Sequence, residues 1–174
     1  SDADFAGCPD HARSTSGVFI RIDGPNTSFP LSAMTKKQTA TAFSTPEAEI
    51  VAANLGLRAE GLPMVTLLES LFGRRIRLNL SEDNQAAIQI FKSGYSPVLR
   101  HTGRTHRINL AWLKEIFEKD YINCRYVLSC EQSADVFTKI FKSPEQWRHA
   151  LNLINHVQPD QFWGTEAPKD ETVC

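Results

Sequence analysis

Residues 76–91 read IRLNLSEDNQAAIQIF, and the change of pattern inside this stretch decides the fold. Apolar side chains alternate with polar ones from Ile76 to Leu80, which is typical of a strand with one buried face. After Asp83 the apolar residues recur at helical intervals as far as Phe91, which predicts a short helix. A strand that leads through two acids into a helix indicates a sheet covered by helices, with carboxylates at a strand end.

The sequence pattern upstream of this stretch predicts an antiparallel meander. Apolar and polar residues alternate over 17–24 and end in the turn pair Asp23-Gly24, so we expect a strand that enters a hairpin. A second strand is expected at about 28–34, and the threonine-rich residues 38–43 are expected to be extended as well.

Helices are expected to follow the meander. Ser44 and Glu47 stand in capping-box spacing with a proline between them, and the helical periodicity continues to Leu55. We expect residues 61–63, Gly-Leu-Pro, to break or kink this helix before a second helical stretch that closes at Gly73.

Strands and helices continue to alternate downstream. We expect a helix over 110–117, a strand over 122–128, a helix from about 132 to 141 and a last helix that ends near 157. The polar residues 158–174 lack periodicity and are expected to form a poorly ordered tail. The pattern therefore predicts one mixed α+β (α/β) domain over residues 1–157, with a single central sheet flanked by helices.

The overall composition limits the kind of protein. The 174 residues are enough for one domain with its own core. The 19 basic and 20 acidic residues give a net charge of −1, which excludes a polycation and places any nucleic-acid contact on a local patch. Because no apolar run could span a membrane and no targeting segment is recognisable, we expect an intracellular protein without a membrane partner.

The four cysteines are too few and too irregularly spaced for a disulfide framework, so free thiols are expected. A zinc set of Cys124 and Cys130 with His101 and His106 is a weaker alternative, because its spacing fits the usual zinc knuckles poorly.

Four acids stand at predicted strand ends and helix starts: Asp2, Glu49, Asp83 and Asp135. Each has a local explanation by itself, as a helix cap, a first-turn acid or a partner of a lysine four residues on. If they gather in space, however, their charges repel strongly unless a divalent cation lies between them. Oxygen-rich sites select Mg²⁺ or Mn²⁺, so such a cluster would indicate metal-assisted phosphoryl chemistry.

Several blocks of the sequence carry a family resemblance. Residues 1–17 contain SDADFAGCPD and RSTSG, 32–38 read SAMTKKQ, 44–49 read STPEAE, 82–88 read EDNQAAI, and 132–139 read QSADVFTK. In the same order, these blocks resemble the motifs of the ribonuclease H domain in copia-type LTR retrotransposon Pol polyproteins. Since the likeness extends from residue 1 to about 142, it is more specific than any single motif.

The resemblance implies a ribonuclease H-like fold with a mixed sheet of about five strands. It also implies a catalytic metal site formed by Asp2, Glu49, Asp83 and Asp135, with two Mg²⁺ ions, or possible Mn²⁺ in their place. The implied activity is hydrolysis of the RNA strand of RNA:DNA hybrids during reverse transcription. An upstream reverse transcriptase domain of the same polyprotein is the implied partner, in cytoplasmic virus-like particles, the nucleus or both.

Some assignments stay open at this point. Asp4 would share a strand face with Asp2, and Glu47 competes with Glu49. Only Ser1 precedes Asp2, so the first strand is expected to be truncated. A catalytically inert nucleic-acid-binding or scaffold domain of the same fold, a retrotransposon remnant, is therefore the alternative function. A nuclease that acts on DNA is disfavoured by the two final aspartates.

The segment between Asn84 and Lys114 contains no acid and is the most basic part of the chain. Such local charge segregation is what phosphate binding needs in a near-neutral protein. Recognition would depend on hybrid shape and 2′-hydroxyl groups, with little sequence preference. The residues expected to contact nucleic acid are Asn84, Gln85, Lys92, Arg100, His101, Arg104, His106 and Arg107.

Overall fold

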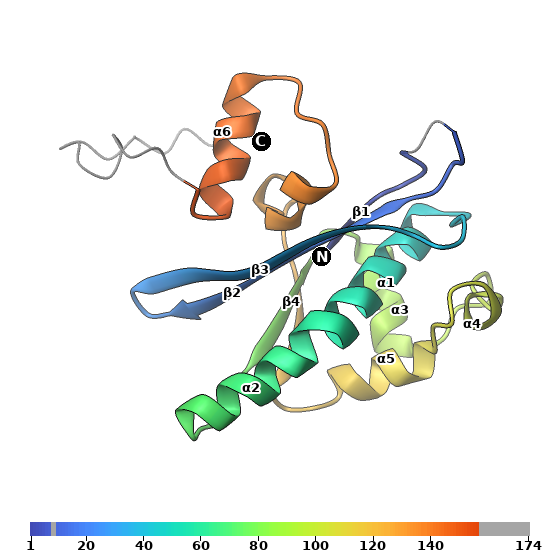
Figure 1. Ribbon diagram of the computed structural model, residues 1–174. Coiled ribbons are helices and arrows are strands. Elements are labelled where there is room, and N and C mark those ends of the chain that lie inside the picture. The colour runs from blue at the N-terminus through green and yellow to red at the C-terminus, as the bar shows by residue number, and fades with distance from the viewer. Residues whose placement is uncertain (8–9, 157–174) are drawn as a thin grey trace.

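The computed structural model describes residues 1–7 and 10–156 and has a mixed α+β architecture (Figure 1). Its strands are β1 (Asp2–Asp4), β2 (Thr15–Gly24), β3 (Thr27–Lys37), β4 (Leu78–Glu82) and β5 (Ile122–Tyr126). The mixed α+β prediction is confirmed, but the expectation of one central sheet is not met. Strands β1, β2 and β3 form an antiparallel sheet, whereas β4 and β5 form a separate parallel pair. The predicted tail, 158–174, lies outside the described residues.

The hairpin of β2 and β3 forms as the alternation predicts, but the third extended segment does not. After Lys37 the chain leaves the sheet, so the prediction of a strand over 38–43 is wrong. The buried amide of Gln38 explains the departure, since its Nε2 donates to Ser16 Oγ at 3.0 Å and to the carbonyl of Ala48 at 2.9 Å. These bonds tie the segment to β2 and to the next helix through the side chain of Gln38, and not as a further strand of the sheet.

One long helical stretch follows, in place of the broken helix that we expected. Helix α1 (Thr45–Leu55) continues through a π-helical segment, η1 (Gly56–Gly61), into α2 (Leu62–Phe72). The backbone at Gly61 is right-handed helical (φ −62°, ψ −55°), so neither Gly61 nor the following proline interrupts the helix. The wider π turn changes the hydrogen-bond register just before Pro63, where the missing N–H would otherwise leave a gap.

The remaining helices are α3 (Gln85–Ser93), α4 (Thr102–Thr105), α5 (Leu110–Phe117) and α6 (Pro144–Leu153). The helix expected over 132–141 is wrong in type. Two short 3-10 segments form instead, η2 (Ser129–Glu131) just before that region and η3 (Ser133–Phe137) within it, and Gln132 between them is extended. The amide of Asp135 accordingly bonds the carbonyl of Gln132, three residues back.

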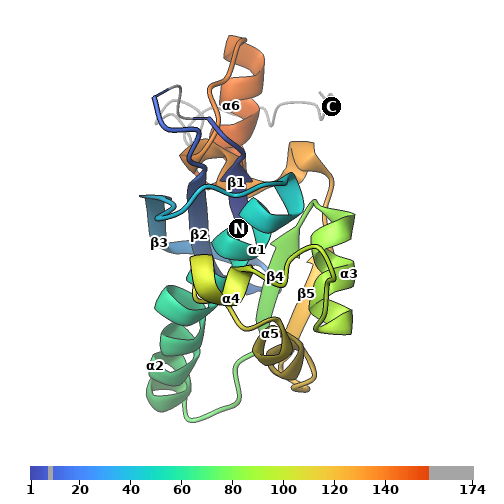
Figure 2. The same ribbon diagram turned by 90° about the vertical axis from the view of Figure 1, so that its right-hand side faces the viewer.

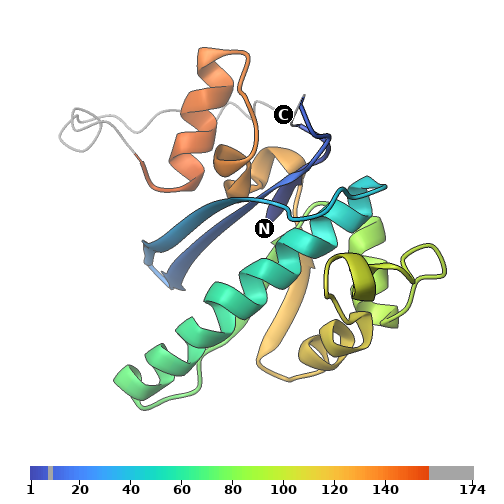
Figure 3. The ribbon, with the colours of Figure 1, turned by 45° about the vertical axis from the view of Figure 1, so that its right-hand side comes forward.

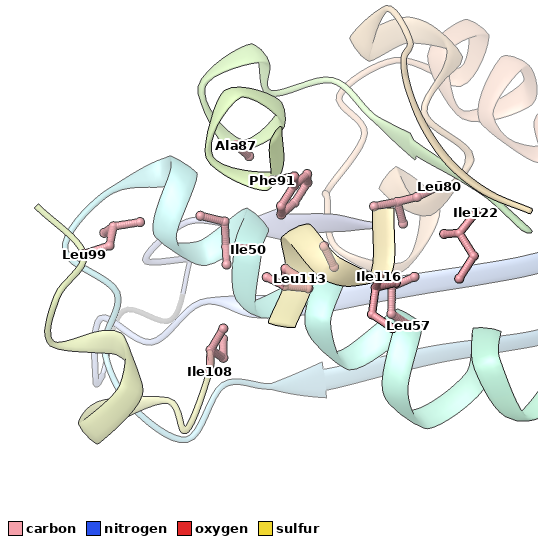
Figure 4. Close-up of a cluster of buried hydrophobic side chains, with 11 residues drawn as sticks. Ile50, Leu57, Leu80, Ala87, Phe91, Leu99, Ile108, Leu113, Ile116 and Ile122 are labelled. Carbon is pink, nitrogen blue, oxygen red and sulfur yellow. The ribbon is translucent and has the colours of Figure 1, made fainter. Parts of the chain in front are cut away.

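The largest hydrophobic core lies between the parallel strand pair and the helices α1, α3 and α5 (Figures 2 and 4). Phe91, Leu113 and Ile122 are at most 1% exposed and fill its centre. Helix α6 and the η3 segment lie on the other side of the β2–β3 hairpin from α1 and α2 (Figures 1 and 3). Three of the predicted acids, Asp2, Glu49 and Asp83, lie near the middle of the molecule, where β1, β4 and α1 meet.

Candidate functional site

Three of the four predicted acids come together in the structure. Asp2 of β1, Glu49 of α1 and Asp83, directly after β4, each offer one carboxylate oxygen, and these oxygens lie within 4.8 Å of one another. Asp2 and Glu49 are buried, at 1% and 3% exposure, whereas Asp83 is half-buried. Such close carboxylates in the interior are unfavourable without a cation or a proton between them.

Local structure explains how each acid reaches this position. Asp2 pairs with Gly17 in the antiparallel ladder of β1 and β2. Glu49 lies in the second turn of α1, whose start is fixed because Ser44 Oγ accepts a hydrogen bond from the amide of Glu47. Asp83 follows the last residue of β4, at the strand end that the sequence pattern indicated.

Side-chain hydrogen bonds hold the carboxylates of Asp2 and Asp83, whereas one oxygen of the Glu49 carboxylate has no hydrogen-bond partner among the described residues. The hydroxyl of Thr138 donates to Asp2 Oδ2, and Ser129 Oγ donates to Asp83 Oδ2 at 2.5 Å. Oε2 of Glu49 is buried and has no hydrogen-bond partner among the described residues. A buried carboxylate oxygen without a partner, on a residue whose carboxylate lies beside two others, is an unsatisfied ligand for a cation.

Burial and mutual repulsion change the ionisation of the site. Burial, followed by repulsion from three neighbouring carboxylates, raises the pKa of Glu49 to about 10. At neutral pH its carboxyl group therefore carries a proton unless a cation is bound nearby. A cation that bound to this cluster would therefore compete with a proton on Glu49.

The fourth acid, Asp135, lies beside the other three but outside their group. Its Oδ2 accepts a hydrogen bond from Lys139 Nζ at 2.8 Å, and the same ammonium lies 3.5 Å from Asp2 Oδ1. Burial and then the charge of Asp2 raise the pKa of Asp135 to about 7. Burial disfavours the charged form of Lys139, but the nearby carboxylates outweigh the effect of burial and raise the pKa of Lys139. The space between Asp2 and Asp135 therefore also favours a positive charge.

The structure separates the acids that sequence reasoning left open. The carboxylate of Asp4 folds back onto Gly7, where it fills the place that a Cβ would take, so Asp2 is the better ligand. Glu47 faces two histidines and does not join the acid cluster. Glu82 is completely buried, and its Oε1 accepts a hydrogen bond from the amide of Asn84 at 3.1 Å.

The clustered acids open into a cavity of about 360 Å³. Its lining includes Asp2, Glu49 and Asp83 together with Asn84 and Lys139. The oxygen-only donor set, with two of its members nearly fully buried, fits a hard divalent cation such as Mg²⁺ or Mn²⁺. Among the described residues this is the group that could hold a metal, and the zinc alternative is not assembled.

Most of the predicted nucleic-acid contacts are on the surface. Gln85, Lys92, Arg100, Arg104 and Arg107 are exposed, and Asn84 is half-buried at the start of α3, where its side chain accepts a hydrogen bond from the amide of Ala87. His101 is partly exposed, at 33% of its side chain. The prediction for His106 needs correction, because its side chain is only 1% exposed and faces Glu47.

Sequence reasoning missed Ser129 and Thr138, which bond two of the clustered acids. Thr138 lies inside one of the family-like blocks, three residues after Asp135, so its position was a usable signal. Nothing in the local pattern marks Ser129. The expectation of free thiols holds for Cys124, whereas Cys130 is in a disulfide.

None of the described helices is long and apolar enough to cross a membrane. Comparisons with protein-family models, with curated proteins and with solved structures found no match for this chain.

Proposed function

We propose that the chain is an endonuclease of the ribonuclease H type, which hydrolyses the RNA strand of RNA:DNA hybrids with two divalent cations, preferably Mg²⁺. The observation that carries the proposal is the convergence of Asp2, Glu49 and Asp83 within 4.8 Å. These acids are separated by up to 81 positions in the chain, and three different elements supply them. The sequence resemblance assigned a catalytic role to the same three residues.

The strand arrangement is compatible with the ribonuclease H-like sheet that the resemblance implies. Strand β1 is paired with β2, and the neighbouring residue Ser1 donates a hydrogen bond from its backbone nitrogen to the carbonyl of Ser81 in β4 at 3.3 Å. The antiparallel sheet and the parallel pair thus lie side by side at β1 and β4. This arrangement supports the proposed fold relationship.

The roles of the chain's own residues follow from their positions. Asp2, Glu49 and Asp83 would hold one ion, and the oxygens of Asp2 and Asp135, now bridged by Lys139, could contribute to a second. Bound Mg²⁺ would supply the Lewis acidity that activates the attacking water and stabilises the leaving 3′ oxygen. Thr138 and Ser129 orient two of the carboxylates, and the exposed arginines near α4 would contact phosphates.

Cleavage of a short RNA:DNA hybrid, labelled on the RNA strand, tests the proposal. We expect cleavage with Mg²⁺, none with EDTA, and no cleavage of duplex DNA. Asp83→Asn should reduce cleavage to background, because it removes a charged ligand while it keeps the shape of the side chain. Asp120→Asn makes the same chemical change at an exposed position outside the acid cluster and should retain full activity.

The same assay separates the alternative functions. Binding of the hybrid without cleavage would support the catalytically inert nucleic-acid-binding domain and refute the proposal. Equal cleavage of duplex DNA would indicate a DNA nuclease. Each measurement should be repeated with a longer chain that also contains the reverse transcriptase domain, the proposed partner.

A further inference from the structure

A second group of titratable side chains lies on another face of α1. The side chain of Glu47 is 0% exposed, and its carboxylate lies against the rings of two histidines. Oε1 of Glu47 lies 2.8 Å from Nε2 of His101 and 3.2 Å from Nε2 of His106. Oε2 accepts a hydrogen bond from the amide of Phe43 at 2.8 Å.

The two histidines stand at opposite ends of α4. His101 immediately precedes this helix and His106 immediately follows it, so a single carboxylate contacts both of its ends. Four helical residues make too few internal hydrogen bonds to be stable by themselves. The position of α4 therefore depends on its contacts with the rest of the fold, which are the burial of Leu99 and Ile108 in the core and the contacts of both of its ends with Glu47 of α1 (Figure 2).

The segment around α4 carries exposed positive charge. Arg100 and Arg107 directly adjoin the two histidines, and Arg104 lies in α4 itself. Side chains two residues apart in a helix point about 200° apart. Glu49 accordingly faces the acid cluster while Glu47 faces α4, so that α1 connects the two.

We propose that Glu47, His101 and His106 form a clamp that fixes the basic segment around α4 relative to the acid cluster, so that its arginines meet the phosphate backbone of a bound hybrid. This inference rests on the proposed function. In this proposal the three clamp residues are positioning residues, since they act through the basic segment that they hold. Burying the carboxylate of Glu47 costs desolvation free energy, and an apolar side chain could fill the same space. The contacts of Glu47 with the two histidines therefore fix the position of α4 more than they stabilise the fold.

The test uses Glu47→Gln, which keeps the size of the side chain and removes its charge. We expect the KM for the hybrid to rise about tenfold, since the buried carboxylate that both histidines contact loses its charge, while kcat stays within about twofold of the wild type. Hydrogen exchange of the backbone amides of residues 99–108 should become faster. Glu60→Gln, which changes a glutamate that accepts a hydrogen bond from Ser32 instead, is the matched control and should change neither quantity.

A variant of His101 provides a second test in case Glu47→Gln does not fold. His101 is one-third exposed, so His101→Gln should fold and give the same changes in KM and exchange. Glu47→Gln weakens the contacts to both histidines and His101→Gln removes one of them, so the double variant should be little worse than Glu47→Gln alone. Additive effects on KM would contradict the clamp.

Two results would overturn the inference: exchange in residues 99–108 that is unchanged in both variants, or a loss confined to kcat with KM unchanged. Failure of the proposed function looks different, because the wild-type chain would then neither bind nor cleave the hybrid. In that case faster exchange in the variants would still support the clamp as a structural device, and unchanged exchange would refute it.

Discussion

Replacement of Glu49 by glutamine should stabilise the metal-free protein. The carboxyl group of Glu49 is buried beside other carboxylates, and burial raises its pKa to about 10 from an ordinary value of 4.5. At pH 7 the folded protein must therefore take up a proton that the unfolded chain does not bind. Glutamine has nearly the same shape and needs no proton, so Glu49→Gln removes this cost.

The size of the effect follows from the distance between pH 7 and the ordinary pKa. At about 1.4 kcal/mol per pH unit, holding a proton on a carboxyl of pKa 4.5 at pH 7 costs about 3 kcal/mol. The buried amide of the variant also needs hydrogen-bond partners, which can reduce the gain to about 1 kcal/mol. For a chain of this length the gain corresponds to an increase in Tm of roughly 3–10 °C.

The sign of the pH dependence is fixed by the direction of the pKa shift. A raised pKa in the folded state means that the contribution of Glu49 to stability is fully present below pH 4.5 and is lost as the pH rises toward 10. The Tm of the variant minus that of the wild type should therefore be zero or negative at pH 4.5, where only the cost of the buried amide remains, and should become positive by pH 7. Thermal unfolding in EDTA, followed by circular dichroism, measures both proteins over this range.

Magnesium should reverse the order of stability. Added Mg²⁺ should raise the Tm of the wild type at pH 7 and leave that of Glu49→Gln nearly unchanged, because the variant lacks one ligand. Glu115→Gln, at an exposed position of α5, is the matched control and should follow the wild type throughout. A variant that is less stable than the wild type in EDTA at pH 7, or a difference that does not depend on pH, would refute the reasoning.

Three further predictions concern the surroundings of the acid cluster. Without metal, Lys139→Met should lower the free energy of unfolding by about 1 kcal/mol, a figure reduced because the lysine side chain is 39% exposed, and Mg²⁺ should restore the stability. A Tm in EDTA equal to that of the wild type would contradict this. Gly17→Ala should destabilise the fold by about 1–3 kcal/mol in urea unfolding, because the new Cβ would lie 2.6 Å from Cγ2 of Thr138; unchanged stability would show that the packing is loose. The affinity for Mg²⁺, measured by calorimetry, should rise from about pH 6 and keep rising toward pH 10, since protons held on Asp135, whose pKa is about 7, and on Glu49, whose pKa is about 10, compete with the ion; a constant affinity would contradict the competition.

The elements predicted from clear periodicity were the ones that formed. The alternation over 17–24, the capping box at Ser44 and the strand that leads to Asp83 all correspond to elements of the structure. These patterns are local, and local side-chain chemistry is enough to produce them. The long-range convergence of the acids was accessible only because the sequence resemblance placed them in one site.

The errors arose where tertiary contacts outweigh local pattern. Residues 38–43 have threonines suited to a strand, but the buried amide of Gln38 bonds Ser16 and α1 instead. The spacing over 132–141 suits a helix, but the backbone at Gln132 is extended and the 3-10 segment η3 that follows it packs closely on Gly17 of β2. His106 was assigned to the surface because the segment is basic, and its buried partner, Glu47, is 59 positions away in the sequence.

The π-helical segment between α1 and α2 determines where the chain tolerates a change of length. A π turn accommodates one residue more than an α-helical turn, so a single deletion between Gly56 and Gly61 could convert it to regular α-helix without rotating the flanking helices. The same deletion inside α2 would turn everything beyond it by about 100° and put Glu69 in the buried place of Leu68. Homologues that lack one residue here should therefore keep the apolar stripe of α2 in phase with α1.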